Sequence, residues 1–165
     1  MELNSIFGLP AHPLIVHAAV VMLPLAAITL IVAALIPRAR RVAAPLALGL
    51  AFVATVAVSL AQGSGEQLQG QVKETALVLQ HAEAADAVLP WAIVVLLAAA
   101  AVTAVGPIQR RLGHRSLSPK LVNGTIAVLA LVAGTGATIT VIDVGHSGAK
   151  ATWNGTVPTS GSDGG

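Results

Sequence analysis

Histidine is the residue type in this sequence that offers the most chemistry, because the chain contains no cysteine. Its five histidines are His12, His17, His81, His114 and His146. Imidazole is a suitable ligand for zinc, copper and haem iron. The absence of cysteine excludes disulfides, a covalent c-type haem attachment and a cysteine nucleophile. Any bound metal would therefore rely on imidazole, carboxylate, methionine or backbone oxygen.

His12 and His17 stand at the start of an apolar stretch. His12 precedes Pro13, which fits the first position of a helix. His17 lies about one turn further in, where an imidazole is costly in lipid unless it is paired or buried among helices. Two alternatives remain open: His17 is bonded to a neighbouring backbone carbonyl, and His12 only marks the beginning of the helix.

His81 and His146 belong to two later segments. His81 lies on an apolar stripe with helical spacing, formed by Leu77, His81, Ala84 and Val88. His146 follows an apolar segment within the glycine-rich stretch 143–148. The alternatives are a packing role for His81 and a surface turn for His146.

Four apolar helices are predicted to position these histidines. Hydrophobic residues make up 55% of the chain and charged residues 10%, and the mean hydropathy is +0.83. A soluble domain carries about 25% charged residues, so most soluble folds are excluded. The uncharged windows are 3–37, 42–65, 87–109 and 121–142, and each can supply the about 20 residues that cross a bilayer. The sequence therefore predicts transmembrane helices at 14–36, 42–61, 87–108 and 120–142.

The predicted fold class is all-α: an antiparallel four-helix transmembrane bundle. A helical extension over 75–86 precedes the third span, and glycines make the beginning of that connection flexible. Residues 1–153 form a single membrane domain, and residues 154–165 form a flexible tail. The sequence shows no convincing internal repeat.

Basic residues predict the orientation of the bundle. Seven of the nine lie in two connections: Arg38, Arg40 and Arg41 after the first span, and Arg110, Arg111, Arg115 and Lys120 after the third. By the positive-inside rule both connections face the cytoplasm, so both termini are extracytoplasmic. The pI of about 9.7 then reflects orientation, and we expect no nucleic-acid partner. Four histidines fall on the outer side, and His114 falls in a cytoplasmic loop.

The outer histidines could converge on one cofactor. We expect His17 and His81 to be the primary ligands of haem b or of a transition metal (Cu, Zn or Fe), with His12 and His146 supporting or completing the site. A metal ion would use His17, His81 and His146, with Asp143, Glu83 and Asp86 orienting the rings from behind. We expect no catalytic residue and no independent enzymatic activity, since Ser147 beside His146 is not a nucleophile and base by adjacency alone.

Two functions remain open. The first is haem or metal binding in electron transfer or metal handling. The second is a structural or assembly subunit that docks on larger membrane or redox proteins, or on a second copy, through small-residue faces, with its histidines only hydrogen-bonded. A transporter made of one chain is not predicted, because no ionisable side chain lies near the middle of a span.

The stretch Leu9-Pro10-Ala11-His12-Pro13-Leu14-Ile15-Val16-His17, followed by Leu23-Pro24, resembles domain-of-unknown-function family 2231. The resemblance covers residues 8–153, and its specific element is HPxxVH. It implies a multi-pass protein of the bacterial cytoplasmic (inner) membrane, and the fusion of some relatives to Rieske or haem domains implies electron transfer. It carries over to His12, His17 and His81, whereas 145–149 departs from the family pattern and leaves His146 without an equivalent.

Overall fold

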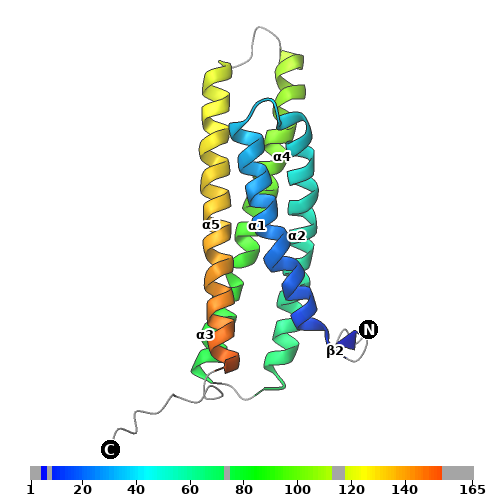
Figure 1. The fold of residues 1–165 in the computed structure, drawn as a ribbon, viewed down its shortest axis with the longest axis vertical. Coiled ribbons are helices and arrows are strands. Elements are labelled where there is room, and N and C mark those ends of the chain that lie inside the picture. Colours follow the sequence, from blue (N-terminus) through cyan, green and yellow to red (C-terminus); the bar gives the residue numbers. More distant parts are fainter. Residues whose placement is uncertain (1–4, 7–8, 73–74, 113–117, 154–165) are drawn as a thin grey trace, which may run out of the picture.

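A computed structural model of the chain describes residues 5–6, 9–72, 75–112 and 118–153. Two short strands precede the helices: β1 (Ser5–Ile6) pairs antiparallel with β2 (Leu9–Pro10). The helices are α1 (Ala11–Leu35), α2 (Arg40–Gln69), α3 (Ala76–Asp86), α4 (Val88–Leu112) and α5 (Pro119–Trp153) (Figure 1). The side chain of Thr75 caps α3 by accepting a hydrogen bond from the Val78 amide. The segment predicted as a helical extension, 75–86, is thus occupied by α3.

Four helical stretches in the described part of the chain are long and apolar enough to cross a membrane. They are His12–Leu35, Arg40–Gln69, Ala76–Arg111 and Lys120–Trp153. The third unites α3 and α4, which only Ala87 separates. The predicted all-α fold with four long apolar helices is therefore confirmed.

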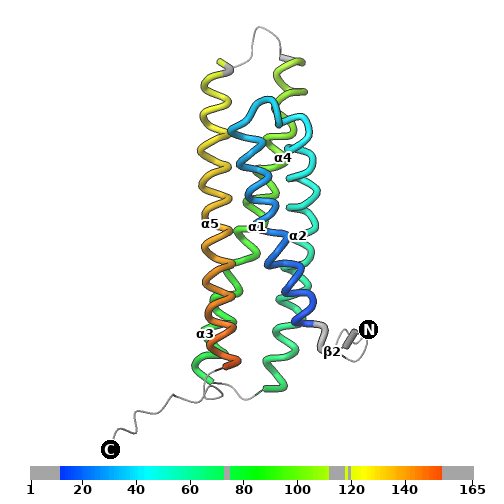
Figure 2. Tube along the Cα trace, viewed as in Figure 1, coloured from blue at the N-terminus to red at the C-terminus, as the bar shows by residue number. Residues whose placement is uncertain are grey.

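The long helices form a four-membered ring in the order α1, α2, α4 and α5, in which each helix packs against its two neighbours. Helices α1 and α4 also contact each other through the middle, so they lie on the short diagonal of the bundle (Figure 2). The core between the helices is built mainly from alanine, including Ala26, Ala47 and Ala99. Small side chains let helix backbones approach closely, which is how helices associate in lipid.

The bundle is built from two halves that repeat one packing pattern. The first half is α1 and α2, and the second half is α3, α4 and α5. Buried residues of α1 recur in α4 with a constant shift of 69 positions: Ala19, Leu23, Ala26, Leu30 and Ala33 match Val88, Ala92, Val95, Ala99 and Val102. Buried residues of α2 recur in α5 with a shift of 83 positions: Ala43, Ala47, Ala51, Ala54 and Val58 match Ile126, Ala130, Gly134, Ala137 and Val141. Most matched positions share burial rather than identity, so the hydrophobic pattern of the sequence does not reveal the repeat.

Helices α2 and α5 are longer than the spans predicted from the sequence. Glycine-rich segments predicted as a flexible connection and as a possible turn, 63–65 and 145–148, are helical instead. Glycine weakens an isolated helix by about 1 kcal/mol, a cost that tertiary contacts can offset, and both segments carry such contacts from a histidine of another helix. At about 1.5 Å per residue, α5 exceeds the about 30 Å thickness of the hydrocarbon core, so its end projects beyond it.

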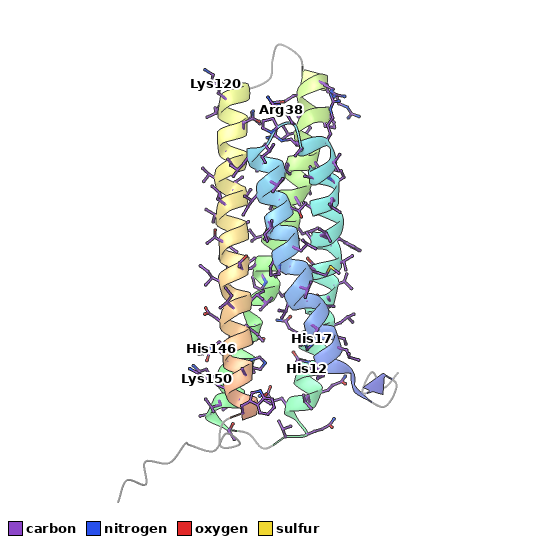
Figure 3. The ribbon with its side chains drawn as sticks, viewed as in Figure 1. His12, His17, Arg38, Lys120, His146 and Lys150 are labelled. Atoms are coloured by element: carbon purple, nitrogen blue, oxygen red, sulfur yellow. The ribbon has the colours of Figure 1, made fainter. Side chains whose placement is uncertain are left out.

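Arg40 joins three helices at the end of the bundle where the basic residues gather. Its guanidinium donates to the carbonyl oxygens of Ala33 (3.0 Å) and Ala34 (3.1 Å) in the last turn of α1, and to Asn123 Oδ1 of α5 (2.9 Å). A cation at a helix C-terminus satisfies free carbonyls and opposes the helix dipole. Figure 3 places Arg38 and Lys120 at this end, and His12, His17, His146 and Lys150 at the other.

Candidate functional site

The first histidine pair of interest joins α1 to α2. His12 heads α1, and its Nδ1 lies 3.0 Å from Ser64 Oγ near the end of α2. Ser64 Oγ also donates a hydrogen bond to the carbonyl oxygen of Ala61 in its own helix (3.0 Å). The imidazole of His12 is half-buried between the two helices.

The second pair repeats this arrangement between α3 and α5. His81 Nδ1 lies 3.1 Å from Ser147 Oγ, and Ser147 Oγ donates to the carbonyl oxygen of Val144 (3.0 Å). The two shifts that match the buried faces of the halves, 69 and 83 positions, also match His12 with His81 and Ser64 with Ser147. The histidine pairs are therefore part of the repeated pattern.

The hydrogen bonds of each serine bear on which nitrogen of its histidine carries the proton. A serine hydroxyl has a single proton, and Ser64 and Ser147 each lie at hydrogen-bond distance from a backbone carbonyl. If that proton goes to the carbonyl, the serine oxygen accepts from its histidine and Nδ1 is the protonated nitrogen. In a neutral imidazole this leaves Nε2 with a free lone pair, the form in which histidine binds a metal.

A glycine follows each serine and makes room for the imidazole. A Cβ atom at Gly65 would lie 3.1 Å from Cε1 of His12, and one at Gly148 would lie 2.9 Å from Cε1 of His81. Both separations are shorter than ordinary van der Waals contact. The Ser-Gly dipeptide thus provides the hydrogen bond and the space that the ring needs.

The two imidazoles lie at the same end of the short diagonal. His12 begins α1, and α3, which carries His81, continues into α4. At the far end Arg40 and Asn123, which are matched positions of the two halves, bond to each other directly. The matched positions are those that a pseudo-twofold axis along the bundle would relate.

His17 lies apart from this pair. Its side chain is exposed on α1, and Nδ1 donates to the carbonyl oxygen of Pro13 at 2.6 Å. This is the alternative in which His17 is bonded to a neighbouring backbone carbonyl. Of the two expected primary ligands, His81 belongs to a histidine and serine pair and His17 does not. His12 occupies the position that matches His81.

His146 is exposed on α5 beside a groove, together with Lys150 (Figure 3). The carboxylates expected to orient the ligands, Glu83, Asp86 and Asp143, are exposed as well. Within the described residues no three side chains of His, Asp or Glu gather in a way that could hold a metal ion. The expected set of His17, His81 and His146 is not brought together, and His114 lies outside the described residues.

Sequence reasoning missed the serines and glycines of the two pairs. A signal for them exists: Ser64-Gly65 and Ser147-Gly148 each follow a threonine by nine positions, and Thr55 and Thr138 both bond to the carbonyl four residues earlier (2.8 Å). The shared threonine, serine and glycine spacing would have revealed the repeat before the structure did.

The chain matches the family described as "Predicted membrane protein (DUF2231)" over residues 8–161 and belongs to that family. Neither the curated proteins nor the solved structures include a match to the chain. The chain is accordingly an integral membrane protein with four possible spans.

Proposed function

We propose that this member of the family binds haem b between His12 and His81 and acts in electron transfer. The observation that carries the proposal is the repeated histidine and serine pair, in which Nδ1 of each imidazole lies at hydrogen-bond distance from a serine hydroxyl. His12 is on α1 and His81 is on α3, which leads into α4, and the two residues occupy matched positions of the two halves. A ligand on the pseudo-twofold axis would therefore meet two equivalent Nε2 atoms.

The number of available ligands favours haem over a lone metal ion. Structural zinc takes four protein ligands and catalytic zinc takes three, whereas haem iron needs only axial ligands from the protein. Within the described residues no three side chains of His, Asp or Glu gather as a metal ion would need, whereas His12 and His81 alone would be enough to hold a haem. Copper and zinc handling through His17, His81 and His146 is therefore the less favoured form of the hypothesis.

Haem would supply a centre that accepts and releases single electrons. The chain itself would hold that centre and set its surroundings. Ser64 and Ser147 would orient the imidazoles and raise their basicity through the Nδ1 hydrogen bonds. The alanine-rich core would keep the inner side of the site apolar and exclude water.

The orientation and location belong to the same proposal. We place the histidine end outside the cytoplasmic (inner) membrane of a bacterium and the arginine end in the cytoplasm. The gathering of Arg38, Arg40, Arg41, Arg110, Arg111 and Lys120 at one end supports this orientation.

Absorption spectroscopy tests the proposal. The protein would be expressed in cells supplied with haem, purified in detergent and analysed for haem and metals. We expect a Soret band that H12A and H81A each abolish, because one axial ligand is lost. H17A is the matched control on the same helix and H146A the control on α5, and both should keep the band.

A colourless and haem-free wild-type protein from haem-supplied cells would contradict the proposal, as would full haem retention by H12A and H81A. Circular dichroism of the variants separates loss of the ligand from loss of the fold. Stoichiometric zinc or copper that H17A removes would establish the metal alternative instead.

The rival function, an assembly subunit, also has support from one observation. A Cβ atom at Gly49, Gly106, Gly124 or Gly145 would meet no atom within 4 Å, so several helix faces could admit a close partner helix. Co-purification distinguishes the two functions. A stable partner that H12A and H81A still bind, in protein without haem, would favour the assembly role.

A further inference from the structure

A groove between α3 and α5 lies beside the second histidine pair. It has a volume of about 490 Å³ and is lined by Leu77, His146, Ala149, Lys150 and Trp153. His146 directly precedes Ser147, the partner of His81, but faces away from that pair into the exposed groove. The groove is thus a separate surface feature at the histidine end of the bundle.

The polar lining of the groove favours an anion. His146 and Lys150 are four residues apart on α5, so they share one face of the helix. None of the five lining residues is acidic, although Glu83, Asp86 and Asp143 are exposed on the same helices. Lys150 is also separated from the arginine end by the length of α5, and so it lies outside the cluster that indicates orientation.

The rest of the lining is apolar. Leu77 and Ala149 form the walls, and Trp153 ends the last apolar stretch with 62% of its surface exposed. Tryptophan is enriched at the level of lipid headgroups, where an amphipathic ring contacts both chains and headgroups. A cation beside an apolar surface complements an amphiphile, in which a charged headgroup adjoins an apolar chain.

The first half of the bundle has no counterpart to this lining. The positions in and just after α2 that match His146, Ala149, Lys150 and Trp153 are occupied by Gly63, Glu66, Gln67 and Gly70. The groove is therefore not a by-product of the repeated packing. Its cation and its aromatic ring occur in one half only, where the other half has a glutamine and a glycine.

We propose that this groove binds an anionic phospholipid, with its phosphate at Lys150 and His146 and the upper part of an acyl chain against Leu77 and Trp153. The complementary charge and the adjacent apolar wall together favour a lipid over free phosphate, which would gain nothing from the wall. The lipid proposal is independent of haem binding, because none of the five groove residues belongs to the two histidine and serine pairs.

Fluorescence quenching tests this assignment, because the chain has only two tryptophans. The variant W91F leaves Trp153 as the single fluorophore. In nanodiscs of phosphatidylcholine with a minor fraction of brominated lipid, we expect brominated phosphatidylglycerol to quench Trp153 about threefold to fivefold more than brominated phosphatidylcholine, since one lysine attracts an anionic headgroup by about that factor. K150Q, which removes the cation while keeping a polar side chain, should bring the ratio to about one, and K120Q at the other end of α5 should not change it.

Equal quenching by the two lipids would overturn the proposal, because the groove would then show no preference for an anionic headgroup. Unchanged selectivity in K150Q would overturn it as well. If W91F fails to fold, native mass spectrometry of the otherwise unaltered protein gives the same comparison. Retained phosphatidylglycerol should then exceed retained phosphatidylcholine in the wild type and in K120Q but not in K150Q.

Discussion

In the first half of the bundle His12 of α1 bonds to Ser64 of α2, and in the second half His81 of α3 bonds to Ser147 of α5. The same register aligns their buried faces. The halves differ in what surrounds this shared frame. The second half has a groove with Lys150, and it packs Trp91 on Gly136, where the first half has Met22 and Val53 at the matched positions.

The features that the two halves share are the ones that a symmetric site requires. The features in which they differ are not required by such a site. Two imidazoles from equivalent positions can meet one ligand on the axis only if both halves keep the same register. A groove or a large aromatic contact needs no such equivalence and can be changed in one half alone. The comparison therefore separates the histidine site from the other features of the second half.

The largest effect concerns the direction of the two halves in the membrane. If an axis along the bundle relates them, both arginine connections lie on one side and both histidines on the other. A periplasmic reporter fused after Gly165 should be active, and one fused at Gly113 should be silent. Because the chain has no cysteine, a single cysteine at Gln71 should react with an impermeant reagent from outside, and one at Arg38 should not.

Opposite reactivity of these positions would place the histidines in the cytoplasm. Reaction of both cysteines from the same side would contradict the proposed arrangement of both halves, because the ends of α2 would then not lie on opposite faces of the membrane. Permeabilised cells, in which both cysteines react, control for access.

The second effect tests the contact that only the second half has. A Cβ atom at Gly136 would overlap the ring of Trp91. We expect G136A to destabilise the protein by about 1–3 kcal/mol, the usual cost of overpacking. G145A on the same helix is the matched control, since a Cβ there meets nothing within 4 Å, and it should be neutral or stabilising by up to about 1 kcal/mol.

Unfolding of the purified protein in mixed detergent and denaturant measures both changes. A G136A protein as stable as the wild type would show that Trp91 moves aside freely. In that case the aromatic contact would not distinguish the second half energetically.

The sequence predicts the four helices because charges are expensive in lipid and so mark the ends of each span. It predicts the stripe of α3 for a similar reason, since a short helix that packs on a bundle needs one apolar face. It does not predict the face of α1 that carries the site. Positions 12 and 17 are about 140° apart around a helix, and α1 is apolar on all sides, so no contrast between core and lipid identifies the inner face.

The continuation of helix through Gly63 and Gly145 has a different origin. Local propensity favours ending a helix near glycine and serine, and the sequence alone shows no opposing contact. The opposing contacts come from His12 and His81, 52 and 66 residues away from their serines along the chain. Such partners become apparent only when the helices are placed side by side.

The smallest effect probes whether the two halves act independently. S64A and S147A each remove one hydrogen bond to a histidine, so each should cost about 1 kcal/mol of stability. Without a ligand the two costs should add in the double variant, because the pairs share no residue and lie on different helices.

With haem bound, each of the two substitutions should also weaken the haem affinity about 10–100-fold, because the imidazole is held less firmly. The double variant should then lose more haem affinity than the two single losses predict, because both imidazoles would hold the same haem. Titration of haem into the four proteins measures this coupling. Additive losses with haem present would mean that the two histidines serve separate ligands, and the symmetric site would be excluded.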